Sequence, residues 1–158
     1  MPYKSSVIFL LCLLLTTCAV FPAENETVKA AESLTQFFQD LADGDYARAD
    51  ELYGGDYEVL QSMNPQIQAE DREALWQNGC AMNGLQCLPV LRIVSSQVTA
   101  EGEYSLVVEF KKPDGGIFVF GPCCGASETE MPPVSQFEYH VVKSDGRFLI
   151  QDLPVFDP

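Results

Sequence analysis

One histidine and one carboxylate near the C-terminus are the residues best suited to proton transfer. His140 is the only histidine of the 158-residue chain, and Asp152 directly follows the last apolar run. Imidazole and carboxylate groups are the usual general bases near neutral pH. A hydrolase also needs a nucleophile and an oxyanion site, and no Walker, G-x-G-x-x-G, G-x-S-x-G or H-E-x-x-H motif occurs. His140 and Asp152 are therefore candidate bases, and the alternatives are a half-exposed strand histidine and a strand-end turn residue.

Aromatic residues in the first half of the chain are the candidates for binding a small apolar ligand. Tyr46, Tyr57 and Trp76, together with Tyr53, could line a pocket for such a ligand. Large amphipathic aromatic side chains at these spacings also fit a hydrophobic core. The sequence leaves both interpretations open.

Acidic residues gather between Asp40 and Glu58. Seven carboxylates lie in this stretch, and Arg48 is its only basic residue. Their spacing, with Gly44 between Asp43 and Asp45, does not follow the alternating pattern of a calcium loop. We expect a solvated acidic helix face, and we predict neither a metal site nor another cofactor.

Four of the six cysteines fall in the second half of the chain. An even number of cysteines in an exported domain indicates a disulfide framework. Bonding of the neighbouring Cys123 and Cys124 would close a strained ring, so at least one bridge should join this pair to Cys80 or Cys87. Spacings of six and zero residues do not suit a zinc site, and no C-x-x-C motif supports a redox pair.

The N-terminus predicts export. Lys4 precedes the nine apolar residues of 7–15. This run is shorter than the roughly 20 residues of a membrane-spanning helix and matches the core of a secretory signal peptide. We therefore assign residues 1–18 to a signal peptide.

The end of this signal resembles a bacterial lipobox. In Leu15-Thr16-Thr17-Cys18, the cysteine would carry the lipid and become the first mature residue. Thr17 departs from the Gly, Ala or Ser usual before the cysteine, and a cut by ordinary signal peptidase at Thr17-Cys18-Ala19 is the alternative. A lipidated Cys18 would hold the protein on a membrane through several acyl chains.

The remaining chain predicts a short tether over residues 19–27 and one α+β domain over residues 28–158. Apolar residues at helical spacing, with capping and stop signals such as Gly44 and Pro65, predict three helices over residues 27–43, 45–53 and 64–78. Alternating apolar residues predict strands over residues 90–99, 104–111, 117–120, 136–143 and 148–150. Asp145-Gly146 is a hairpin turn, and His140 shares a strand face with Glu138 and Val142. We expect three N-terminal helices packed on one curved antiparallel sheet.

Two segments resemble the nuclear-transport-factor-two-like, cystatin-like superfamily. Residues 37–49, FFQDLADGDYARA, are similar to the F-x-x-A-L-x-x-G-D-Y-x-x-A helix junction of its bacterial lipoproteins, and residues 146–150, GRFLI, to its final strand. The resemblance implies a cone-shaped domain with a pocket between the sheet and the first helices, and frequent dimerisation. It does not imply one activity. Ketosteroid isomerase and scytalone dehydratase share this fold, and no catalytic motif of either aligns here.

The net charge of the chain limits the classes of partner that it can bind. Nine Lys and Arg residues against 23 Asp and Glu residues give a net charge of −14, which argues against nucleic-acid binding and against docking on anionic lipid. The sequence therefore favours a non-catalytic extracytoplasmic (lipo)protein domain, a binding or accessory module of the cell envelope whose small-molecule or protein partner is unspecified. The alternative is a small-molecule isomerase, dehydratase or hydrolase that uses the cone pocket. A homodimer through the convex sheet face is a third hypothesis. For the enzyme, His140 or Asp152 must open into a cavity beside a hydrogen-bonded partner.

Overall fold

Four helices precede four strands in the part of the chain that the structure describes, residues 22–122 and 124–157 of a computed structural model. The strands form one antiparallel sheet in sequence order. The predicted α+β class and antiparallel meander are therefore confirmed. The elements are α1 (Pro22–Asp43), α2 (Tyr46–Leu52), α3 (Glu58–Met63), α4 (Arg72–Ala81), β1 (Val90–Ala100), β2 (Glu103–Phe110), β3 (Phe137–Ser144) and β4 (Arg147–Ile150).

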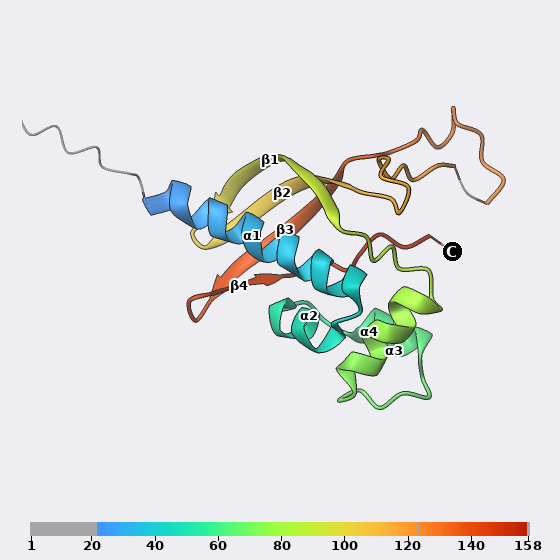
Figure 1. Ribbon diagram of the computed structural model, residues 1–158, viewed down its shortest axis with the longest axis horizontal. Coiled ribbons are helices and arrows are strands. Elements are labelled where there is room, and N and C mark those ends of the chain that lie inside the picture. The colour runs from blue at the N-terminus through green and yellow to red at the C-terminus, as the bar shows by residue number, and fades with distance from the viewer. Residues whose placement is uncertain (1–21, 123, 158) are drawn as a thin grey trace, which may run out of the picture.

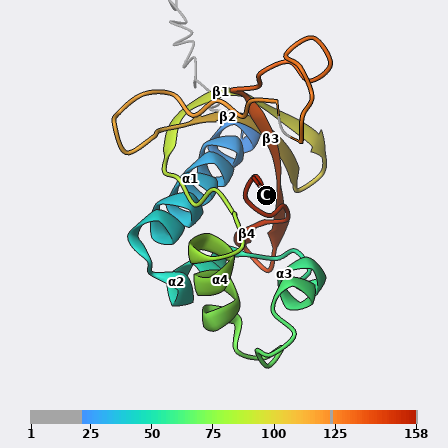
Figure 2. The same cartoon turned by 90° about the vertical axis from the view of Figure 1, so that its right-hand side faces the viewer.

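Helix α1 lies across one face of the sheet, and α2, α3 and α4 gather at one end of it (Figures 1 and 2). The predicted apolar stripe of α1 is buried, with Leu34, Phe37 and Phe38 fully covered. Phe38 packs edge-to-face on Phe110 of β2 and Tyr139 of β3, at ring-centroid distances of 4.6 and 4.9 Å. Burial of this stripe against the sheet joins the two layers.

Two predicted turns are present where the sequence signals placed them. Gly44 ends α1 with a positive φ of 79°, and the Asp45 side chain caps α2 by accepting a hydrogen bond from the Arg48 N–H. Asp145 and Gly146 both have positive φ, 50° and 79°, and join β3 to β4. Two positive φ values in a two-residue turn match the twist of the hairpin strands.

The predicted third helix is wrong in its N-terminal half. Asn64 ends α3 instead of starting a helix, and α4 begins only at Arg72, where Asp71 caps it. The reason is long-range: the buried Asn64 side chain donates to the Leu60 carbonyl and to Asn83 Oδ1, both at 2.9 Å. These bonds hold Asn64 at the end of the preceding helix, and no pattern in the sequence predicts α3 itself.

The predicted tether is also wrong where the structure describes it, because residues 22–27 belong to α1. Glu26 fixes this end of α1 to the sheet: its carboxylate accepts hydrogen bonds from Lys143 and, at 3.0 Å, from the Tyr104 hydroxyl. Residues 1–21, with the signal peptide and Cys18, lie outside the described residues.

The Glu26 contacts predict acid sensitivity. Hydrogen bonds from Lys143 and Tyr104 lower the pKa of the Glu26 carboxyl. A carboxyl with a lowered folded-state pKa stabilises the fold above its unfolded value of about 4.3, and this contribution is lost as pH falls through the folded-state pKa. Melting temperatures measured from pH 7 to pH 3 should therefore fall less steeply for Lys143→Met than for wild type. Lys111→Met, at an exposed lysine, is the control, and parallel curves for wild type and Lys143→Met would contradict the contact.

The predicted strand over residues 117–120 is not formed as a strand. Ile117 forms an isolated bridge with Lys111, and Phe120 forms another with Val134. The Phe118 N–H donates to the Phe110 carbonyl at 2.9 Å. The segment meets a different partner at each of these residues, so no continuous ladder develops.

Strand β1 is the open edge of the sheet, and it is strongly bulged. Its register against β2 shifts at three places, between residues 90 and 92, 93 and 95, and 98 and 100. Each shift sets two residues of β1 against one of β2, which bends the strand and increases its twist. The opposite edge is covered in part, since Tyr53 bridges to Ile150 of β4.

The disulfide differs from the predicted pairing. Cys80 is bonded to Cys87, with Cα atoms 5.5 Å apart, so a bridge from either of them to Cys123 or Cys124 is wrong. The chain reverses after α4 through Gly84, at φ +84°, and the Leu85 N–H donates to the Gly79 carbonyl at 3.1 Å. This local reversal brings residue 87 back beside residue 80. Cys123 lies outside the described residues.

Candidate functional site

His140 and Asp152 are in contact. One carboxylate oxygen, Asp152 Oδ2, accepts the backbone N–H of His140 at 2.5 Å and lies 3.0 Å from its ring nitrogen Nδ1. When Nδ1 carries the proton, this bond fixes the ring orientation and leaves the lone pair of Nε2 directed away from the carboxylate. A carboxylate that orients an imidazole in this way is a common support for a general base or a metal-binding histidine.

The register of the last hairpin produces this contact. The two-residue turn at Asp145-Gly146 pairs β3 with β4 so that residue 140 lies opposite residue 151, and the Gln151 N–H donates to the His140 carbonyl at 2.9 Å. Asp152 is the next residue. The sequence contained this signal, because a two-residue turn fixes the strand register.

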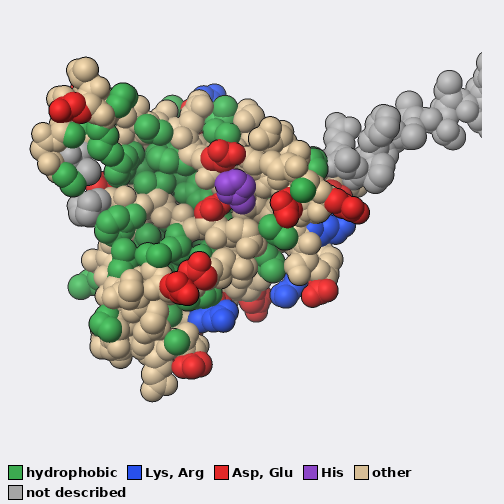
Figure 3. Space-filling view, turned by 180° about the vertical axis from the view of Figure 1, so that it is seen from behind, with side chains coloured by type: hydrophobic (Ala, Val, Ile, Leu, Met, Phe, Trp, Pro, Cys, Tyr) green, Lys and Arg blue, Asp and Glu red, His purple; other side chains and the backbone are tan. Residues whose placement is uncertain are grey.

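The neighbours of His140 do not complete a nucleophilic site. Ser105 lies directly opposite His140 on β2, and its hydroxyl donates to the Glu138 carboxylate. A serine nucleophile would instead be hydrogen-bonded to the imidazole that activates it. His140 lies on the sheet face away from α1, because its neighbours Tyr139 and Val141 are buried on the α1 side, and Figure 3 shows the histidine at the surface with acidic side chains nearby.

This pair lies on an open surface. The His140 side chain is 54% exposed and that of Asp152 is 39% exposed. Neither residue lines the two cavities described below. His140 therefore has the hydrogen-bonded partner that an enzyme requires, namely Asp152. In the described part of the chain, this pair does not adjoin either cavity.

The larger of these cavities is a groove of about 620 Å³ between α1 and β1. This is the side of the sheet on which the family resemblance places a pocket. Its lining is mostly apolar side chains and uncharged polar ones, and Glu32 supplies its only charge. The residues are Thr27, Val28, Ala31, Glu32, Thr35, Gln36 and Gln39 of α1 and Ile93 and Ser96 of β1.

The smaller cavity, of about 320 Å³, lies where the end of α1 meets the segments that flank β1 and β2. Its lining includes Cys87 of the disulfide and the adjacent Lys111 and Lys112. Lys112 is paired with Asp114 at 3.3 Å, so half of this local positive charge is already neutralised. The remaining single exposed lysine does not define a ligand.

The aromatic candidates pack together. Trp76 is fully buried and meets Tyr53 and Tyr57 edge-to-face, at centroid distances of 5.0 and 5.9 Å. Its indole N–H donates to the Tyr57 hydroxyl at 3.2 Å, and burial with the hydrogen bond to Asp50 raises the pKa of that hydroxyl. Tyr46, Tyr57 and Trp76 line neither cavity, so their role as a pocket stays a prediction.

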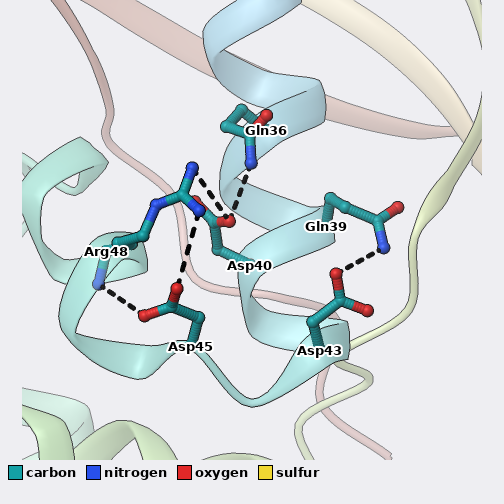
Figure 4. Close-up of polar contacts among 6 residues, drawn as sticks. All are labelled: Gln36, Gln39, Asp40, Asp43, Asp45 and Arg48. Atoms are coloured by element: carbon teal, nitrogen blue, oxygen red, sulfur yellow. Dashed lines mark hydrogen bonds and ion pairs between the residues drawn. The ribbon is translucent and has the colours of Figure 1, made fainter.

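The acidic segment joins two helices (Figure 4). The buried Asp40 carboxylate accepts from Gln36 Nε2 at 2.7 Å and lies 3.7 Å from Arg48, which also pairs with Asp45 at 3.6 Å. Gln39 and Asp43 form a separate exposed pair at 2.9 Å. Within residues 22–122 and 124–157, no group of three or more His, Cys, Asp or Glu side chains is placed to hold a metal ion. These contacts fix the α1–α2 junction.

The comparisons with known proteins indicate no function for this chain. No family model matches the chain. No curated protein matches it either. The His140–Asp152 pair and the α1–β1 groove are thus the two features from which a function can be argued.

Proposed function

We propose that this protein is a non-catalytic extracytoplasmic domain, anchored through lipid at Cys18, that serves as a binding or accessory module of the cell envelope. The observation that carries the proposal is the groove between α1 and β1, which offers apolar surface and is lined by neither of the two candidate bases, His140 and Asp152. Ligand sites are typically concave, mostly apolar and about 300–1,000 Å³ in volume.

The disulfide supports the proposed location. Disulfides persist in oxidising compartments and are rare in the cytosol. The Cys80–Cys87 bond therefore agrees with the signal-like N-terminus of the sequence. Within the described ranges, no helix has the length and apolar character that a membrane crossing requires.

The bulged sheet supports a cone-shaped, cystatin-like architecture as part of this proposal. Three bulges in β1 bend the strand that flanks α1. The helix junction that carries the family resemblance is held by the buried Asp40 and by Arg48. These features give the resembling residues a structural role, independent of any activity in the family.

Cys18→Ser is the test of the anchor. The variant should move from the membrane fraction to the soluble fraction, because a lipidated cysteine is the only proposed attachment. Cys12→Ser, within the apolar run that precedes the lipobox, should leave the distribution unchanged. Intact mass of the wild-type protein, with and without reductant, should show the cut, the lipid and the disulfide. Unchanged partitioning of Cys18→Ser contradicts the anchor, and an uncut chain contradicts export.

The second candidate function is a small-molecule enzyme, and one observation favours it. The hydrogen bond between Asp152 and the His140 imidazole is the contact that a general base needs. The pair lies on the sheet face away from α1, whereas the groove lies on the α1 side. Base and groove are therefore separated by the sheet, and we place binding before catalysis.

A further inference from the structure

The groove along α1 has the dimensions of an extended peptide. Its α1 wall is formed by residues spaced about one turn apart, from Thr27 to Gln39, which is one flank of the helix. The distance from Val28 to Gln39 along the helix axis is roughly 16 Å, and this length matches about five residues of extended chain.

The second wall is the uncovered part of β1. Ile93, Ser96 and Val98 pair with residues of β2 that are buried under α1, so these three side chains project to the same side of the sheet as α1. Ser96 is exposed, and Val98 is 52% exposed. The sheet thus extends beyond the helix, and apolar surface on both walls is open to solvent, with Val28 also 52% exposed.

The negative charge in and around the groove favours a positively charged ligand. Glu32 is the charged residue of the groove, and no residue in the described part of the chain forms an ion pair or hydrogen bond with its carboxylate. The segment 22–81, which contains α1 to α4, holds 13 acidic residues and three basic ones. A ligand that enters this field gains from positive charge.

A second copy of the chain fits poorly. The net charge of −14 on each copy opposes association of two identical surfaces. Pairing of β1 with its equivalent is further limited by the three bulges, which leave only residues 95–98 between two shifts as a regular run. Bulges of this kind protect an edge strand from edge-to-edge association.

We propose that the groove binds a cationic amphipathic peptide segment of a partner protein, in extended conformation. This inference rests on the proposed binding function and specifies its partner. Apolar side chains of the segment lie on Val28, Ala31 and Ile93, and a Lys or Arg side chain reaches the Glu32 carboxylate. The outer edge of β1 over residues 95–98 is available for a few backbone hydrogen bonds.

The experiment is a fluorescence-anisotropy titration of the purified full-length protein with a labelled eight-residue peptide of alternating Val and Lys. The matched peptide with Glu in place of Lys should not bind. Glu32→Gln should weaken binding about threefold, the value of one exposed ion pair. Glu51→Gln removes a carboxylate from α2, outside the groove, and should leave affinity unchanged.

Steric variants separate groove binding from attraction to the acidic surface in general. Ala31→Trp should abolish saturable binding, whereas Ala47→Trp, at an exposed position of α2, should not. Ser96→Arg blocks the groove from the β1 wall and replaces Ala31→Trp if that variant fails to fold by circular dichroism. Binding that survives both groove variants, or equal loss in Glu51→Gln, overturns the proposal. These results do not depend on where the protein is exported, so they are distinct from the Cys18 test.

Discussion

Phe38→Ala should lower the free energy of unfolding by about 3–5 kcal/mol, the range for deleting a fully buried phenylalanine. Its ring has no exposed surface and packs on Phe110 and Tyr139, the residues that β2 and β3 contribute beneath α1. Loss of the ring leaves a cavity between helix and sheet, and both the transfer term and the lost edge-to-face contacts contribute. Urea denaturation of the oxidised protein, followed by tryptophan fluorescence, measures the effect.

Phe156→Ala is the matched control for this substitution. The Phe156 side chain is 41% exposed near the C-terminus, and its removal should cost less than about 1 kcal/mol. Equal losses in the two variants, or a loss below about 1 kcal/mol for Phe38→Ala, would mean that α1 does not lie on this face of the sheet. The groove would then lose its α1 wall, and the proposed partner with it.

The parts of the fold that were predictable are those fixed by neighbouring residues. The stripe from Leu34 to Leu41 has helical period, and its burial follows once a sheet is available to cover it. The alternation of Tyr104 to Phe110 placed one face of β2 in the core correctly. Turn residues set the hairpin at residues 145–146, because positive φ values favour Asp and Gly locally.

The parts that failed depend on contacts distant in sequence. Asn64-Pro65 is a helix-start signal by itself, and Asn64 ends α3 because its side chain is bound by Asn78 and Asn83, 14 and 19 residues away. The alternation over residues 104–111 places Glu109 on the face of β2 opposite to Tyr104 and Phe110, yet Glu109 is only 3% exposed, since Arg92 and Gln136 cover its carboxylate. Neither set of partners could be read from local pattern.

One part of the candidate site, the positions of His140 and Asp152, was predictable from local sequence pattern, and the other part, the groove, was not. His140 was placed on the correct face of its strand and Asp152 at the end of the last strand, and each was evaluated alone. Their contact follows from the hairpin register, which the sequence did contain. The groove is different: it exists because β1 bends and extends beyond α1, and three bulges on one strand leave no simple sequence signal.

Removal of the disulfide should cause the second-largest loss of stability among the predicted variants. Cys80→Ser with Cys87→Ser is expected to lower the free energy of unfolding by about 2.5 kcal/mol, the chain-entropy value for a loop of about eight residues. The bonded loop also positions Leu85, which packs against Gly79 of α4, and Gln86, whose N–H donates to the Val155 carbonyl at 2.8 Å. Guanidinium denaturation with and without reductant measures the same quantity in the wild-type protein.

Cys124→Ser decides between the two pairings. If Cys80 is bonded to Cys87, the variant with serine at both positions lacks the stability that the disulfide contributes, and reductant does not lower its stability further in this region. Cys124→Ser keeps the bonded loop and therefore keeps most of the stability that the wild-type protein loses on reduction. A peptide map of the unreduced protein should contain residues 80 and 87 in one linked fragment. A fragment that links either of them to the segment of residues 123–124 would restore the long-range bridge of about 40 residues, for which the same model gives about 4 kcal/mol. That outcome would also place this segment against the end of α4 and change the surface beside the smaller cavity, so the map tests the structure there as well as the bond.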